Sequence, residues 1–200
     1  MPALPNSMIP FWIKITYTFF AVITVAVYAV KYPPGNFLWF SDIALVLTVP
    51  ALWLESSMLA SMMAIAVLLP EAFWNAGYFA RLFTGKRLAG LTDCMFDIKK
   101  PLYLRALSLF HVFLPALLLW MVARLGYAPQ ALPAQTILAW IVLPLTYWLT
   151  DPALNVNWVF GPHSVQRNHP PAFVHLGLLM IGLPLLVYVP THVLLQVLFG

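Results

Sequence analysis

Residues 102–125 read LYLRALSLFHVFLPALLLWMVARL, and this stretch decides the fold. An α-helix needs ~20 mainly apolar residues to cross a hydrocarbon core about 30 Å thick. The stretch is long and apolar enough to do so, although it carries Arg105 near its start and His111 in its interior. It therefore predicts a transmembrane helix.

Similar apolar segments occur along the whole chain, and all but the first contain a proline. Prolines inside membrane helices usually produce kinks, which neighbouring side chains accommodate. The sequence therefore predicts an all-α fold, a polytopic transmembrane helix bundle of about six kinked spans that forms a single domain over residues 1–200. The predicted spans are residues 11–30, 37–54, 58–79, 102–125, 136–150 and 173–198.

The composition supports this class and excludes most others. The 200 residues are 62% hydrophobic and 8% charged, with a mean hydropathy of +0.89, whereas a soluble domain is about a quarter charged. The net charge of +4 reflects a shortage of carboxylates, and the basic residues sit in short connections. This distribution predicts membrane lipids, and not nucleic acid, as partners. The single Cys94 excludes an intrachain disulfide.

The orientation follows from the basic residues, because cytoplasmic loops of membrane proteins are enriched in Lys and Arg. Residues 81–105, RLFTGKRLAGLTDCMFDIKKPLYLR, hold six of the ten basic residues, so we expect this loop in the cytoplasm. With six spans, both termini then lie outside. The segment after residue 10 has no small-residue cleavage pattern, so we expect it to remain as the first span. A helical bundle also favours the bacterial inner membrane over the outer one.

Ionisable residues inside predicted spans are the first candidates for function, because they are costly there. Asp42, Glu71 and His111 fall at a similar depth beneath the cytoplasmic face, since each residue of a helix adds 1.5 Å. They could form a catalytic site in which His111 is the general base, Ser41 is the nucleophile, and Asp42 or Glu71 orients the imidazole. Alternatively, Asp42 and His111 only share a packing hydrogen bond, and Glu71 snorkels or pairs with Asn75.

The connection before the last predicted span supplies candidates for substrate binding. Its segment LNVNWVFGP could grip a lipid head group through Asn155, Asn157 and Trp158, and we add Arg105 to this group. The alternative is a turn whose asparagines bond their own backbone.

The histidines outside the proposed site match no metal-binding pattern, and we predict neither a metal centre nor a cofactor for this chain. Three of them lie between residues 163 and 175, but their spacing matches no ligand motif. His192 lies near the outer end of the last predicted span, where an interfacial position is expected. The three histidines of the connection are His163, His169 and His175.

Several phrases of the sequence, NFLWFSDIAL, GLTDCMFD, LRALSLFHVFLP, NVNWVFGP and LLVYVPTH, resemble an uncharacterised bacterial family of multi-pass membrane-associated proteins of the Planctomycetes type. That resemblance implies a topology. More distantly, the aromatic second span with its polar pair and the histidine one turn before Pro115 resemble the androgen-induced membrane hydrolases and related lipid acyltransferases. Those proteins use a threonine nucleophile and a histidine. The resemblance implies that His111 is the base, whereas Trp39 occupies the threonine's place and leaves Ser41 as the substitute.

Three functions are compatible with these patterns. The first is a membrane-embedded hydrolase or acyltransferase that acts on lipid acyl esters from the cytoplasmic leaflet. The second is a small proton-coupled transporter in which Asp42, Glu71 and His111 relay protons. The sequence shows no inverted repeat and is small for a transporter. A homo-oligomer, such as a dimer, could compensate for the small size of one chain. The third is a non-catalytic membrane assembly subunit.

Overall fold

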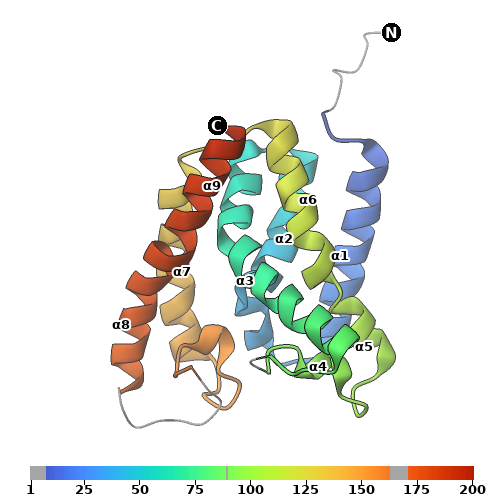
Figure 1. Cartoon of the computed structure of the whole chain (residues 1–200), viewed down its shortest axis with the longest axis vertical. Helices are drawn as coiled ribbons and strands as arrows, with labels where there is room; N and C mark the ends of the chain where they lie inside the picture. The colour runs from blue at the N-terminus through green and yellow to red at the C-terminus, as the bar shows by residue number, and fades with distance from the viewer. Residues whose placement is uncertain (1–7, 89, 163–170) are drawn as a thin grey trace.

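The computed structural model describes residues 8–88, 90–162 and 171–200, and in these residues the chain is helical with no strand (Figure 1). The two short 3₁₀ helices and the π-helical segment are denoted η. The elements are α1 (Phe11–Lys31), η1 (Pro34–Leu38), α2 (Phe40–Trp53), α3 (Ser57–Thr84), α4 (Asp93–Phe96), α5 (Leu102–Leu107), α6 (Phe110–Leu125), α7 (Ala131–Leu149), η2 (Val156–Trp158), α8 (Ala172–Leu183), η3 (Pro184–Tyr188) and α9 (Val189–Phe199).

Five helical segments are long and apolar enough to cross a membrane, which confirms the all-α, membrane-compatible class. α5 and α6 together make one of them, and α8, η3 and α9 make another. The 14-residue α2 is apolar but shorter. The five segments are Phe11–Lys31, Ser57–Thr84, Leu102–Leu125, Ala131–Leu149 and Ala172–Phe199.

Some helix boundaries differ from the predicted spans for local reasons. α2 begins at Phe40 and not at residue 37, because the preceding residues form the 3₁₀ turn η1. α3 continues past residue 79 to Thr84, where Gly85 ends it in the left-handed conformation at φ 71° and donates its N–H to the carbonyl of Arg81. α7 begins five residues before the predicted start at residue 136, because Pro133 is tolerated in the first turn of a helix.

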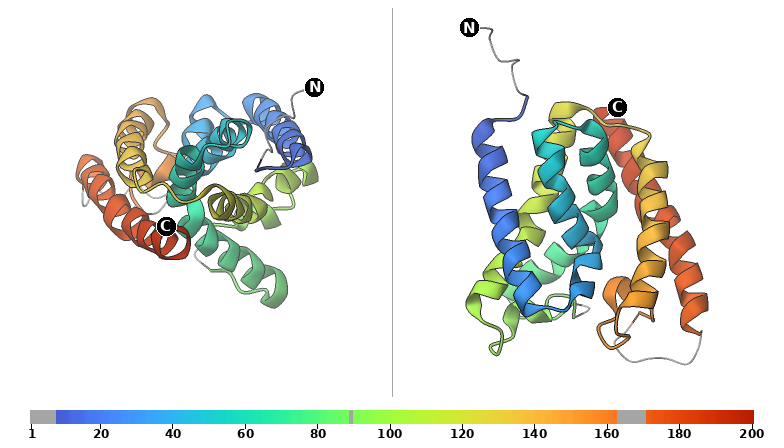
Figure 2. Two further views of the ribbon diagram at one scale, coloured as in Figure 1. Left: turned by 90° about the horizontal axis from the view of Figure 1, so that it is seen from above. Right: turned by 180° about the vertical axis from the view of Figure 1, so that it is seen from behind.

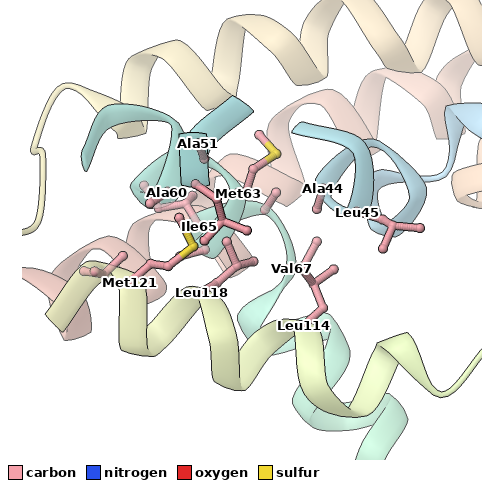
Figure 3. Close-up of a cluster of buried hydrophobic side chains, with 14 of the residues drawn as sticks. Ala44, Leu45, Ala51, Ala60, Met63, Ile65, Val67, Leu114, Leu118 and Met121 are labelled. Atoms are coloured by element: carbon pink, nitrogen blue, oxygen red, sulfur yellow. The ribbon is translucent and has the colours of Figure 1, made fainter. Parts of the chain in front are cut away.

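The core forms where α2, α3 and α6 meet, with α3 the most buried of the long helices (Figures 2 and 3). Small side chains such as Ala44, Ala51 and Ala60 are fully buried there and let the backbones approach closely. Larger apolar side chains fill the remaining space. The labelled core residues of Figure 3 are Ala44, Leu45, Ala51, Ala60, Met63, Ile65, Val67, Leu114, Leu118 and Met121.

Prolines shape the helices, as the sequence predicts. α3 contains Pro70, and the second half of this helix turns away from the rest of the bundle (Figure 2). A proline also leaves the carbonyl four residues earlier without its helical donor. Pro184 does this to Met180, and the indole of Trp140 on α7 donates to that carbonyl at 2.8 Å. Neighbouring helices therefore satisfy the backbone at a kink.

The two ends of the bundle differ in character. α1 begins and α9 ends at one end, whereas α4, α5 and η2 lie at the other (Figure 1). At the first end, the Glu55 carboxylate accepts hydrogen bonds from the N–H groups of Met8 and Ile9 and from the buried ammonium of Lys14, at 2.7 to 3.3 Å. Glu55 thereby ties the start of α1 to the turn between α2 and α3.

A close contact between η1 and the end of α7 generates the first prediction. A Cβ atom added at Gly35 would lie 2.7 Å from Cγ2 of Thr150, which is too short for any carbon pair. We expect Gly35→Ala to lower the free energy of unfolding by about 1 to 3 kcal/mol, as overpacking typically does. Thermal unfolding in detergent measures the effect.

Thr150→Ser provides the matched control, because it removes Cγ2 and keeps the hydroxyl that donates to the Thr146 carbonyl. The double variant is expected to regain most of the lost stability. A double variant that stays as unstable as Gly35→Ala would show that this contact is not the cause.

Candidate functional site

One cavity of about 810 Å³ lies at the end of the bundle that carries α4, α5 and η2. Every residue that the sequence assigns to catalysis or substrate binding lines it, although the residues come from α2, α3, α5, α6 and the connection after α7. These residues are Ser41, Asp42, Glu71, Arg105, His111, Asn155, Asn157 and Trp158.

The centre of the cavity is a hydrogen-bonded pair between α3 and α6. His111 Nδ1 lies 2.8 Å from Oε1 and 3.0 Å from Oε2 of Glu71. Glu71 is buried, with an exposed fraction of 4%. An ionised carboxylate only accepts hydrogen bonds, so Nδ1 is the donor in this pair, and in a neutral imidazole Nε2 then carries the lone pair. The imidazole also stacks on the rings of Trp74 and Phe110. Glu71 thus fixes both the tautomer and the orientation of His111.

Asp42 is buried in the same cavity but has a different partner. The side chain of Asn36 donates to Asp42 Oδ2 at 3.2 Å, and Oδ1 is buried without a partner among the residues that the structure describes. In the same residues there is no hydrogen bond between Asp42 and His111, so the packing bond considered from the sequence is not formed. Glu71, not Asp42, is the carboxylate that orients the imidazole.

Two serine hydroxyls face the cavity with different surroundings. Ser108 lies in the break between α5 and α6, where its hydroxyl bonds to Tyr28 at 3.0 Å and donates to the carbonyl of Leu104. Ser41 lies in the first turn of α2, beside Asp42. Within the described ranges, no hydrogen bond joins Ser41 to His111. Ser41 is therefore the hydroxyl that is less engaged by the protein.

Asn75 holds the two helices of the central pair together. Its side-chain amide donates to the carbonyl of Glu71 at 2.8 Å and to the carbonyl of His111 at 2.7 Å. The His111 carbonyl needs this donor, because Pro115 has no N–H to give it. The sequence offers Asn75 only as a partner for the Glu71 carboxylate, and the structure corrects this: the amide binds the two backbone carbonyls.

The connection after α7 is held by its own asparagines. Asn157 donates to the carbonyl of Leu38 at 2.7 Å and accepts from the N–H of Phe40, so it caps the start of α2. Asn155 bridges the carbonyl of Gly161 and the N–H of Phe160. The bonds of Asn155 match the alternative of a turn whose asparagines bond their own backbone, whereas Asn157 bonds the backbone at the start of α2, the helix that carries Ser41. A role in substrate binding stays a prediction for both asparagines.

Three basic side chains line the cavity: Arg87, Lys100 and Arg105. Arg87 forms an ion pair with Asp93, which also pairs with Arg81. Cys94 is half-buried on the same wall, and burial raises the pKa of its thiol. The thiol therefore stays protonated and unreactive at neutral pH.

The remaining histidines lie elsewhere or outside the described residues. His175 bonds through Nε2 to the carbonyl of Trp158 at 2.9 Å. His192 bonds through Nδ1 to the hydroxyl of Tyr127 at 2.6 Å, where burial raises the pKa of that phenol to about 12. His163 and His169 lie outside the described residues. Within the part of the chain that is described, no three His, Cys, Asp or Glu side chains could hold a metal ion.

The described residues form an all-helical protein with five apolar helices long enough to cross a membrane, and this class is compatible with an integral membrane protein. No known protein family, no curated protein and no solved structure matches the chain. The geometry of the cavity must therefore carry any functional conclusion.

The two hydrogen bonds of Asn75 generate a prediction. It tests whether Asn75 stabilises the protein because Pro115 leaves the His111 carbonyl without a donor. Asn75→Ala leaves the His111 carbonyl without a donor, and we expect a loss of about 1 to 3 kcal/mol in the free energy of unfolding. Pro115→Ala restores an N–H four residues after His111. The same Asn75→Ala change in the Pro115→Ala background is expected to cost much less, as a double-mutant cycle in detergent would measure.

Equal costs in the two backgrounds would contradict this account. Asn75 would then stabilise the protein through its bond to Glu71 alone, and Pro115 would play no part.

Proposed function

We propose that this chain is an integral protein of the bacterial cytoplasmic membrane that hydrolyses or transfers the acyl group of a lipid ester at the cytoplasmic leaflet. The observation that carries the proposal is the Glu71–His111 pair, which presents an oriented imidazole to a cavity at the basic end of the bundle. General acid–base catalysis by such a pair contributes about 10²- to 10⁴-fold to a reaction rate.

The course of the chain supports six spans. α1 and α3 are both long enough to cross, and α2 returns the chain between them. The 14 residues of α2 cover only about 21 Å, so we place the start of this span in the 3₁₀ turn η1. The loop with six of the ten basic residues then faces the cytoplasm, with Met8 and Gly200 on the outside.

This topology predicts a labelling pattern. In a chain whose only cysteine is removed by Cys94→Ser, we introduce Ile98→Cys or Met8→Cys, because both positions are exposed, at 93% and 54%. A membrane-impermeant maleimide added to intact spheroplasts is expected to label the cysteine at position 8 and to spare the one at position 98. Permeabilised cells, in which both are labelled, are the control. Labelling of position 98 alone would invert the topology.

The reaction can be written with the residues of the cavity. His111 Nε2 takes the proton of the Ser41 hydroxyl as its oxygen bonds to the acyl carbon. The ester C–O bond then breaks, and the imidazolium gives the proton to the departing alcohol. Water, or a second alcohol, repeats these steps and releases the acyl group from Ser41. Glu71 accepts from Nδ1 throughout and stabilises the imidazolium.

The start of α2 supports the same chemistry. The first N–H groups of a helix have no acceptor in their own helix, and they favour negative charge. Ser41 lies in this first turn, so these groups flank the oxygen that becomes negative when the acyl carbon is attacked. Asn157 keeps the turn in place through its two bonds to the backbone.

Two measurements on the full-length protein in detergent test the proposal. Hydrolysis of p-nitrophenyl octanoate is expected to fall about 10²- to 10⁴-fold in kcat/KM for His111→Gln. It is also expected to fall strongly for Glu71→Gln, because an amide no longer fixes the proton on Nδ1. A fluorophosphonate probe is expected to label Ser41 and to lose that label in Ser41→Ala.

His192→Gln is the matched control, since it removes an imidazole at the other end of the bundle. Activity that survives Ser41→Ala but not His111→Gln would assign the attack to water. Activity that is the same in all variants would end the proposal.

A second function is favoured by one observation, the buried Oδ1 of Asp42 that has no partner in the described residues. A buried charge without a partner is costly, so a carboxyl group in this position is suited to bind and release a proton. Proton-coupled uptake into proteoliposomes that is lost in Asp42→Asn, with no esterase activity, would favour a transporter.

A further inference from the structure

Acidic and basic side chains line the same cavity and differ in exposure. Asp42 and Glu71 are 5% and 4% exposed, whereas the side chain of His111 is 20% exposed. Lys100 belongs to the basic loop and Arg105 to the last turn of α5, and both are partly exposed, like His111. A ligand that fills the cavity would therefore meet both cations and the imidazole.

Among the described residues, neither cation forms an ion pair, and Lys100 Nζ lies 5.9 Å from the centre of the Tyr32 ring. Arg87 pairs with Asp93, but neither Lys100 nor Arg105 has a carboxylate within ion-pair distance among the described residues. The guanidinium of Arg105 makes one long bond of 3.4 Å to the carbonyl of Met95, and its Nε is buried without a partner in the same residues. A buried donor without an acceptor costs free energy, so this group is suited to an anion.

We propose that Lys100 and Arg105 bind the phosphate of a phospholipid whose acyl ester reaches His111. The planar guanidinium binds two phosphate oxygens at once, and the ammonium of Lys100 adds a point charge. Arg105 and His111 lie on either side of the break between α5 and α6, and both line the cavity. In a glycerophospholipid the phosphate and the ester carbonyls are separated only by the glycerol, so one lipid molecule in this cavity can contact both residues.

The cavity favours a phosphate carried by a lipid over free phosphate. Its volume of about 810 Å³ lies within the roughly 300 to 1,000 Å³ typical of sites for whole organic ligands. Apolar side chains such as Pro70, Trp74 and Leu104 line it together with the charges. The binding step is independent of catalysis, and the inference rests on the proposed function only for the fate of the ester.

Native mass spectrometry of the full-length protein in detergent tests the binding step. We expect phosphatidylglycerol to bind at least about tenfold more tightly than diacylglycerol with the same acyl chains, as charge-assisted hydrogen bonds would give. Lys100→Gln with Arg105→Gln is expected to remove this preference. Lys99→Gln is the matched control, because Lys99 directly precedes Lys100 in the chain and is not among the residues that line the cavity.

A charge-conserving variant and free phosphate complete the binding experiment. Lys100→Arg with Arg105→Lys keeps both charges and is expected to retain binding, which separates lost charge from a misfolded variant. Equal binding of diacylglycerol, or full binding by the double glutamine variant, would overturn the inference. Inorganic phosphate that binds as tightly as the lipid would overturn the assignment to a headgroup.

His111→Gln separates this inference from the proposed reaction. This variant is expected to bind phosphatidylglycerol normally while it loses hydrolysis. Normal binding in a wild-type protein that hydrolyses no ester would overturn the reaction and leave the headgroup site intact.

Discussion

A backbone carbonyl in hydrocarbon must have a donor, and each proline inside a helix removes one. This constraint organises the bundle. Pro115 frees the carbonyl of His111, which takes its hydrogen bond from Asn75 on α3. In the same way Pro184 frees a carbonyl that bonds to Trp140 on α7. At these two prolines, neighbouring helices are therefore joined by hydrogen bonds, and one of the two joins lies at the candidate site.

The same requirement for hydrogen-bond partners applies to the polar groups of the cavity. Glu71 and His111 satisfy each other, so burial of this pair is tolerable without water. Within the residues that the structure describes, Asn36 bonds only one oxygen of Asp42, and the buried Nε of Arg105 has no acceptor. Groups that fold into such positions lower the stability of the protein, which is typical of residues kept for a ligand or a reaction and not for packing.

Much of the fold follows from the sequence, because length and hydropathy alone determine whether a helix can cross a membrane. The constant rise of a helix also predicts Asp42, Glu71 and His111 at one level, and they do line one cavity. The helical rise does not determine whether Asp42 or Glu71 faces the imidazole of His111. That choice depends on how each helix is rotated about its axis and on the kinks. The organising roles of Asn75 and Glu55 do not follow from the sequence, because their partners are groups 36 to 47 residues away.

The junction between η2 and α2 has a consequence for sequence divergence. Asn155, Asn157 and Trp158 all adopt positive φ, at 42° to 57°, a conformation that costs most residues about 1 to 2 kcal/mol and that asparagine and aspartate adopt most readily after glycine. Few substitutions can keep both this backbone and the cap on Phe40. The spacing Asn-x-Asn-Trp after the proline-containing helix α7 therefore offers a signature by which descendants of the same ancestor could be recognised after the sequences of their apolar helices have diverged.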